Sequence, residues 1–328
     1  MKVNYAQAMA RAVRESLQAD PKTFLIGSTF AGLSEPGRVA FAPVLQEYAT
    51  RVLAAPVSEL GLAGTAIGAA LAGSRPLVDL GAGSFAFQAW AQIANEAPNL
   101  HYMSGGRTKV PVTLYCLIGI RGGGAAQHSH RIQAMLGNIP GLQLLMPATP
   151  ADAYSMLKWA LQDSEGPTVF LSHSVLLEDE EEVDFGASAL PVGKARIARE
   201  GRDVSIIAHS VMVPRALVAA DQLARQGVLA EVVDMRTLCP LDRETMVNSV
   251  VKTGRAVVPD ECHFSFGAGA ELAATLAQHA FGALKAPVHR VATPDAPIPF
   301  SPVLETAMIV TPEKIAAGAL EIMNFRKA

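Results

Sequence analysis

The chain has 328 residues, of which 50% are apolar and 17% are charged, and its formal net charge is −3. This small negative charge gives no electrostatic basis for binding nucleic acid, so we predict no nucleic-acid partner. No apolar run reaches the ~18 residues of a membrane-spanning helix, so we predict no membrane partner. A chain of this length can bury two large cores, which favours two domains.

The N-terminal segment and the cysteines indicate where the protein works. Residues 1–5 lack the apolar stretch and the cleavage site of a signal peptide. Cys116, Cys239 and Cys262 are odd in number and widely spaced, which is typical of a reducing compartment without disulfides. We therefore expect a cytoplasmic protein. Its apolar composition also predicts extensive subunit interfaces.

The first half of the chain alternates between helical and strand-like patterns. Strands that alternate with helices predict a parallel sheet covered on both faces. The expected helices are residues 5–18, 63–72, 86–97 and 150–162, and the expected strands are 24–27, 52–54, 77–80, 112–116, 142–147 and 168–171.

A run of acids over residues 178–186 reads as a solvated linker, and the alternating pattern then restarts. We predict an α/β fold of two domains, residues 1–185 and 190–328, each a mainly parallel sheet covered by helices. In the second domain the expected strands are 204–208, 229–234, 256–259 and 288–291, and the expected helices are 213–226, 269–283 and 311–323.

The most informative segment is Pro56-Val57-Ser58-Glu59-Leu60-Gly61. Ser58 is a suitable N-cap, and Glu59 falls in the first turn, where the helix dipole favours an anion. The following helix is almost entirely Gly, Ala, Leu and Ile, so we expect it to be buried on all sides. A carboxylate at the mouth of a buried helix is costly unless it is paired, which suggests a ligand. A helix-capping acid in a salt bridge is the alternative, since acids are common in the first turn of a helix.

This segment resembles the Glu-containing motif of the beta subunits of thiamine-diphosphate-dependent decarboxylase components of 2-oxo-acid dehydrogenase complexes, of the pyruvate, branched-chain and acetoin types. The resemblance covers the whole chain. Further matching motifs are Arg75-Pro76, Gln88-Ala89, Gln92-Ile93, Tyr102-Met103-Ser104-Gly105-Gly106, Gln127-His128-Ser129, Pro140-Gly141-Leu142, Pro147-Ala148-Thr149-Pro150-Ala151-Asp152-Ala153, Arg236-Thr237-Leu238-Cys239-Pro240-Leu241-Asp242 and Pro299-Phe300-Ser301-Pro302-Val303-Leu304-Glu305.

The resemblance implies a transketolase-like pyrimidine-binding domain followed by a transketolase C-terminal-type domain. It also implies that Glu59 hydrogen-bonds the aminopyrimidine ring of thiamine diphosphate and that Phe85 stacks on that ring, with Leu60 and Gln88 as further cofactor contacts. A carboxyl group that protonates the ring nitrogen would promote the imino tautomer that activates the cofactor. Core packing is the alternative role for Phe85.

His128 matches the family histidine that faces the reaction centre. It lies in the glycine-rich segment 122–130, where the backbone can approach a ligand closely. Such a histidine could bind the substrate carboxylate or move a proton during acyl transfer. His128 and His130 also have metal-ligand spacing, but no third ligand lies nearby in the sequence. The glycines lack the following Lys-Ser/Thr of a phosphate-binding loop.

The family's Gly-Asp-Gly motif, which holds Mg²⁺ and the diphosphate, is absent from this sequence. The resemblance therefore implies that an alpha subunit supplies that half of the site, in an assembly of two alpha and two beta chains, and that this chain alone is inactive. It also implies a lipoyl acyltransferase partner. In some relatives backbone oxygens bind K⁺, and the matching positions here are Val112, Ala160, Asp163 and Glu165.

Three segments depart from the family pattern. Ser28-Thr29 replaces the usual acids, and Gly81-Ala82-Gly83 replaces aromatic residues, which suggests a wider substrate pocket. The segment from Asp260 to Gly267 keeps an acid but has no arginine. These departures leave the substrate and the acyltransferase partner open.

The main interpretation is a beta subunit that decarboxylates a 2-oxo acid and passes the acyl group to a lipoyl domain. The alternatives are an acetoin dehydrogenase subunit, half of a split transketolase-like enzyme, and a non-catalytic assembly subunit. A phosphosugar substrate would need additional basic groups, for which Arg121, His130 and Arg131 are the candidates.

Overall fold

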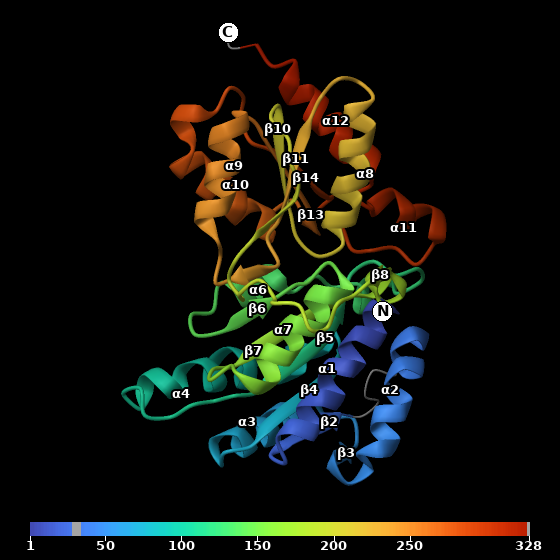
Figure 1. Cartoon of the computed structure of the whole chain (residues 1–328), viewed down its shortest axis with the longest axis vertical. Helices are drawn as coiled ribbons and strands as arrows, with labels where there is room; N and C mark the ends of the chain where they lie inside the picture. Colours follow the sequence, from blue (N-terminus) through green and yellow to red (C-terminus); the bar gives the residue numbers. More distant parts are fainter. Residues whose placement is uncertain (28–33, 327–328) are drawn as a thin grey trace. The chain divides into compact units, whose positions relative to one another are not determined.

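The computed structural model describes residues 1–27 and 34–326 (Figure 1). The chain divides into two compact units. The first contains Met1–Arg121 and Gln127–Val192, and the second contains Gly122–Ala126 and Gly193–Ala328. Each unit is described by itself below.

The first unit is built on a parallel sheet with the strand order β6-β7-β5-β4-β2-β3. Strands β5 and β7 are buried along their whole length, as the continuous apolar runs predict for a sheet covered on both faces. The strands are β2 (Thr23–Gly27), β3 (Val52–Ala54), β4 (Arg75–Ala82), β5 (Thr113–Ile118), β6 (Gln143–Leu145) and β7 (Thr168–His173).

Helix α1 (Tyr5–Ala19) packs against α7 (Pro150–Gln162) and α2 (Glu35–Glu47) (Figure 1). The start of α1 is fixed by a capping box, in which Asn4 Oδ1 accepts from Gln7 N and Gln7 Oε1 accepts from Asn4 N. The remaining helical segments of this region are η1 (Ala49–Arg51), α3 (Glu59–Leu71), η2 (Gly83–Ala89), η3 (Ala91–Glu96), α4 (Ala97–Met103), α5 (Ala125–His128), α6 (Gln133–Gly137) and η4 (Ser174–Glu178).

The run of acids is not only a linker, so that part of the prediction was wrong. Strand β8 (Glu180–Glu182) pairs antiparallel with β1 (Lys2–Asn4). The Lys2 ammonium lies 2.5 Å from the Glu180 carboxylate, and the Met1 ammonium lies 3.0 Å from Glu182. Opposite charges on neighbouring strands therefore accommodate an acidic strand that composition alone assigns to a loop.

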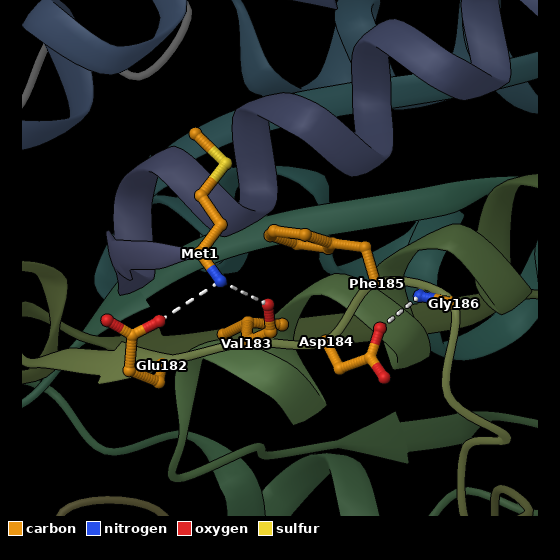
Figure 2. A pocket seen from close by; sticks show the side chains of 6 residues that line it. All are labelled: Met1, Glu182, Val183, Asp184, Phe185 and Gly186. Atoms are coloured by element: carbon orange, nitrogen blue, oxygen red, sulfur yellow. Dashed lines mark hydrogen bonds and ion pairs between the residues drawn. The ribbon is translucent and has the colours of Figure 1, made fainter.

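The end of this strand lines an open hollow of about 520 Å³ (Figure 2). There the Met1 ammonium donates to Val183 O, and Gly186 N donates to Asp184 Oδ1. The ion-pairing side chains are 69% and 75% exposed, so their attraction contributes little to stability. No residue of the predicted site lines this hollow, whose lining consists of Met1, Glu182, Val183, Asp184, Phe185 and Gly186.

Two expectations about helices were also wrong. Helix α3 is not buried on all sides, because Leu60 and Leu71 are 54% and 44% exposed. The continuous helix expected over residues 86–97 is divided into the 3₁₀ segment η2 and the π-helical segment η3, and α4 follows. Such irregular turns are frequent at functional sites.

The second unit is built on a sheet with the order β14-β13-β10-β11-β9, in which only β9 runs antiparallel to its neighbour. Its strands are β9 (Arg196–Arg199), β10 (Val204–Ala208), β11 (Ala230–Asp234), β13 (Ala256–His263) and β14 (His289–Thr293); the short strand β12 (Thr237–Cys239) follows β11 in the chain.

Helices cover both faces of this second sheet (Figure 1). Helix α8 packs against α12, and α9 packs against α10. The core of this unit includes Ile207, Val233 and Leu276, all fully buried. Its helical segments are α8 (Met212–Ala224), α9 (Arg243–Thr253), α10 (Ala268–His279), η5 (Phe281–Ala283), α11 (Pro302–Met308) and α12 (Pro312–Met323). Across residues 1–27 and 34–326, every helix is too short or too polar to cross a membrane.

Candidate active site

Glu59 lies in the first turn of α3. Ser58 caps this helix, since its Oγ accepts a hydrogen bond of 3.3 Å from Gly61 N. The Glu59 side chain is half-buried, and within the described parts of the chain its carboxylate has no hydrogen-bond or ion-pair partner. The carboxylate is therefore positioned to bind a group that residues 1–27 and 34–326 do not supply.

Phe85 and His128 lie together, although 43 positions separate them in the sequence. Phe85 belongs to η2, and His128 ends the one-turn helix α5. Their ring centroids are 5.4 Å apart and their planes are at 82°, which is the edge-to-face geometry that aromatic rings prefer. Both rings are half-buried, so each keeps a surface that a ligand can reach.

Helix α3 packs against η2 and η3, which brings the element that carries Glu59 next to the element that carries Phe85. At Gly64 the packing is close but would accept a side-chain carbon, because a Cβ there would lie 3.8 Å from Gln92 Cγ, an ordinary van der Waals distance. Leu60 is 54% exposed and Gln88 is exposed. The side chain of Gln88 has no hydrogen bond within residues 1–27 and 34–326. Their predicted cofactor contacts stay predictions.

Three polar atoms beside these rings were not predicted from the sequence. The Oγ of Ser84, the Oε1 of Gln92 and the Oγ of Ser129 are buried and have no hydrogen-bond partner in the described part of the molecule. A buried polar atom without a partner costs about 1–3 kcal/mol. Gln92 and Ser129 lie in motifs that match the family, but serine and glutamine are common in helices and loops, so residue type did not mark these atoms as part of a site.

A second pair of rings lies beside the first. The Phe87 and His130 centroids are 5.2 Å apart with planes at 81°, and Phe87 also meets Trp90 at 6.3 Å. The sequence signal for this pair was the matched spacing of Phe-x-Phe and His-x-His. His128 and His130 thus contact different aromatic partners, and no cluster of three or more His, Cys, Asp or Glu side chains suited to a metal occurs among the residues described.

Three of the four backbone oxygens at the predicted potassium positions already accept hydrogen bonds. Val112 O accepts from Thr168 N at 2.9 Å, and Glu165 O accepts from Val110 N at 3.0 Å. Ala160 O accepts from Thr113 Oγ1 at 3.3 Å.

The Arg75 guanidinium donates to the carbonyl oxygens of Leu161 and Ser164, on either side of Asp163. A guanidinium in the same loop opposes a further cation. The potassium prediction for Val112, Ala160, Asp163 and Glu165 therefore stays a prediction, and this arginine weighs against it.

Gly81, Ala82 and Gly83 are buried, and this does not support the wider pocket expected at these positions. A Cβ on Gly83 would lie 3.0 Å from Ile118 Cγ2 and 3.3 Å from His130 O. Gly83 is therefore surrounded by packed atoms. The other departure near the cofactor, Ser28-Thr29, lies outside the described residues.

The Asp260 carboxylate of the second unit is held by hydrogen bonds from backbone N–H groups. Its Oδ1 lies 3.5 Å from His209 Nε2 and accepts from Cys262 N, while its Oδ2 accepts from Gly269 N. Burial opposes the charged form, but the hydrogen bonds and the nearby imidazole prevail and lower the pKa of Asp260. The acid in this segment therefore links the carboxyl end of β10 to β13 and α10.

Comparison with known proteins agrees with this geometry. Residues 1–179 match the family of the transketolase pyrimidine-binding domain, and residues 193–315 match that of the transketolase C-terminal domain. A solved structure described as a split-gene transketolase, an inactive beta4 tetramer, superposes with a TM-score of 0.79 at 25% identity and covers 99% of both chains. The fold is thus that of a two-domain transketolase-type protein.

Two relatives of known description identify the family to which the chain belongs among the transketolase-type proteins. The beta subunit of acetoin:2,6-dichlorophenolindophenol oxidoreductase from Cupriavidus necator is 39% identical over 332 residues, covering 98% of each chain. The pyruvate dehydrogenase E1 component subunit beta of Rickettsia conorii is 37% identical over 325 residues, covering 99% of each chain. The chain belongs to this transketolase-like family of pyruvate and acetoin dehydrogenase beta subunits.

Proposed function

We propose that this chain is the beta subunit of a thiamine-diphosphate-dependent 2-oxo-acid dehydrogenase component. In this proposal the enzyme decarboxylates a 2-oxo acid in the cytoplasm and passes the acyl group to a lipoyl domain. The observation that carries the proposal is the Glu59 carboxylate, which lies at the start of α3, beside the ring-bearing element η2, and has no partner among the residues that the structure describes.

The residues present fit one half of a thiamine site. Glu59 offers a carboxyl to a ring nitrogen, and Phe85 offers a flat apolar face. The buried oxygens of Ser84 in η2 and Gln92 in η3 offer hydrogen-bonding capacity on the elements that pack against α3. When bound, thiamine diphosphate supplies an acidic ring carbon that can attack a carbonyl group. Glu59 would hold a proton at the pyrimidine nitrogen and recover it, as a general acid–base group does.

His128 would act on the substrate side of the site. Its contact with the Phe85 ring fixes the plane of the imidazole, and its half-buried position leaves part of the ring accessible. An imidazole held in this way can donate a hydrogen bond to the carboxylate of a 2-oxo acid, and it can hold or release a proton when the acyl group moves to a lipoyl sulfur.

The other half of the site would come from an alpha subunit. This sequence has no Gly-Asp-Gly motif to hold Mg²⁺ and the diphosphate. Exposed apolar side chains near α3 and on α4 support a partner surface, namely Leu60, Tyr102 and Met103. The description of the split-gene transketolase as inactive in a beta4 tetramer also supports dependence on a second chain. We propose two alpha and two beta chains and a lipoyl acyltransferase partner. K⁺ binding stays a prediction, against which the Arg75 guanidinium weighs.

Calorimetric titration with thiamine diphosphate and Mg²⁺ tests this proposal. We expect weak or undetectable binding to the isolated chain, and tight binding of one cofactor per beta chain once the alpha subunit of the same organism is co-expressed. Stoichiometric, tight binding to the isolated chain would refute the half-site. A complex that binds no cofactor would refute the proposed function and favour a non-catalytic assembly subunit.

A further inference from the structure

Helix α11 of the second unit turns an acid inward and apolar side chains outward. Glu305 is 4% exposed, whereas Val303 and Leu304 of the same helix are 80% and 58% exposed. Glutamate is almost never fully buried unless it is paired, while valine and leucine are among the residues most often found inside. This reversal of the usual pattern indicates that the Glu305 carboxylate is held inside for its hydrogen-bonding chemistry.

The Glu305 carboxylate binds the backbone of the glycine-rich segment. Its Oε2 accepts a hydrogen bond of 2.9 Å from Gly123 N, although 182 positions separate the two residues. Its Oε1 is buried and has no hydrogen-bond partner among the residues that the structure describes. Residues 122–126 belong to the second unit together with Glu305, so this contact lies within one unit. A hydrogen bond to a carboxylate is stronger than one between neutral groups, because the acceptor is charged.

The segment that this carboxylate binds has an unusual backbone conformation. Gly122 and Gly123 have φ angles of +76° and +74°, and Ala125 has a φ of +50°. Glycine adopts such angles readily, but at alanine the Cβ atom comes too close to the following carbonyl oxygen. Strained residues of this kind persist only where the surrounding structure holds them, and they cluster at functional sites. The hydrogen bond at Gly123, two residues before Ala125, is placed to hold this strain.

The strained residue begins the helix that carries the candidate catalytic histidine. Helix α5 is a single turn that starts at Ala125 and ends at His128. A helix this short has almost no stability of its own, so its position depends on what holds its two ends. At one end the His128 ring meets the Phe85 ring, and two residues before the other end Gly123 is bound to Glu305. The position of the imidazole therefore depends on both contacts.

We propose that Glu305 is a positioning residue for His128, whose carboxylate fixes the glycine-rich segment so that the imidazole is held in the orientation that acyl transfer needs. This inference rests on the proposed function, because that function assigns His128 to acyl transfer. Glu305 touches none of the reacting atoms, and its effect reaches the reaction only through the backbone from Gly123 to His128. The alternative is a purely structural role in the second unit.

Amide hydrogen exchange of the full chain, followed by mass spectrometry, tests the contact without turnover. Glu305→Met keeps the length of the side chain and suits a buried position, but it removes the acceptor. We expect exchange in the peptide that contains Gly123 to become at least tenfold faster, since loss of a hydrogen bond to a charged group changes an equilibrium by about 10–100-fold. Glu305→Gln keeps an acceptor oxygen and should restore most of the protection.

The role in the reaction is tested in the complex of this chain with its alpha subunit, loaded with thiamine diphosphate and Mg²⁺ and supplied with pyruvate and a lipoyl domain. We expect Glu305→Met to reduce acyl transfer about tenfold, by the same hydrogen-bond argument, and to leave exchange of the thiazolium proton within about twofold. Added to His128→Ala, it should cause less than about a twofold further loss, because a positioning residue has no effect once the group that it positions is absent. Glu305→Gln should recover most of the acyl-transfer rate.

The matched control is Glu313→Met, which changes an exposed acid in the first turn of the next helix, α12. It should alter neither the amide exchange of residues 122–126 nor the rate of acyl transfer. A Glu313→Met variant that behaves like Glu305→Met would show that the effect does not come from the contact with Gly123, and would overturn the inference.

Three other results would also overturn this inference. One is unchanged amide exchange in Glu305→Met, and another is a full, independent loss when Glu305→Met is added to His128→Ala. The third is a Glu305→Met chain that fails to assemble or that loses proton exchange and acyl transfer equally, which would assign Glu305 a structural role. Failure of the proposed function is distinguishable, because Glu59→Gln tests that function in the same complex and the amide-exchange experiment needs no cofactor.

Discussion

Glu15 links α1 to α7, and its charge should make the stability of the first unit depend on pH. Its carboxylate accepts hydrogen bonds from Lys158 Nζ at 2.6 Å, from Tyr154 Oη at 2.6 Å and from Arg11 Nε at 2.8 Å. Desolvation alone would raise the pKa of Glu15, but these hydrogen bonds prevail and lower it from 4.5 to about 2.

The lowered pKa of Glu15 determines how much its charge contributes to the free energy of unfolding. A pKa drop from 4.5 to about 2 corresponds to at most about 3 kcal/mol in favour of the folded state at neutral pH. The side chain is 28% exposed, and screening by solvent reduces this value to about 1–2 kcal/mol. Because the folded pKa is the lower one, the stabilisation is complete above pH ~4.5 and is lost as the pH falls toward 2.

Glu15→Gln should therefore lower the melting temperature of the isolated chain at pH 7 by about 3–6 °C. The difference from the unmodified chain should shrink progressively below pH 4.5. Thermal unfolding followed by circular dichroism between pH 3 and 8 measures this. Glu35→Gln is the control, because its pair with Arg38 is 3.7 Å long and its side chain is 79% exposed. A Glu15→Gln deficit that stays constant over the whole pH range would refute the electrostatic reasoning.

Gly119→Ala should unfold the first unit or lower its melting temperature by more than 10 °C, because the new Cβ would lie 1.9 Å from His173 Nε2 at a φ of +97°. The control is Gly105→Ala, which should reduce the free energy of unfolding by only about 1–2 kcal/mol, because Gly105 has a φ of +65° and no atom would lie within 4 Å of the new Cβ. Equal melting temperatures for the two variants would contradict the packing argument. In the loaded complex, His128→Ala should leave exchange of the thiazolium proton within about twofold and reduce acyl transfer to a lipoyl domain at least tenfold. Proton exchange slowed as much as in Glu59→Gln would instead place His128 in cofactor activation.

Much of the architecture could be predicted from the sequence, because the apolar runs are short, continuous and separated by helical patterns. Strand β3 and helices α7 and α12 start and end close to their expected positions. Each of these helices begins with Pro after a threonine N-cap, Thr149 or Thr311, which is a local signal. The pairing of β8 with β1 could not be predicted, since it depends on charges that only the fold brings together.

Some features of the candidate site could likewise be predicted from the sequence, and others could not. The start of α3 at Glu59 follows from Ser58 as N-cap, and the resemblance pointed to Phe85 and His128, whose contact only the structure reveals. The irregular turns of η2 and η3 could not be read from residues that favour a regular helix. The Phe87–His130 pair has only the matched Phe-x-Phe and His-x-His spacing as a sequence signal, and the close approach at Gly83 beside it is a non-local contact that the sequence does not reveal.

The central claim is that the Glu59 carboxylate exchanges a proton with the cofactor ring, and one measurement tests it most directly. Glu59→Gln preserves the shape of the side chain and removes its ability to donate and recover a proton. In the loaded complex of this chain with its alpha subunit, the rate of hydrogen–deuterium exchange at the thiazolium carbon should fall by about 10²–10⁴-fold, while cofactor binding persists. An exchange rate within a few-fold of the unmodified complex, with the cofactor fully bound, would contradict the account.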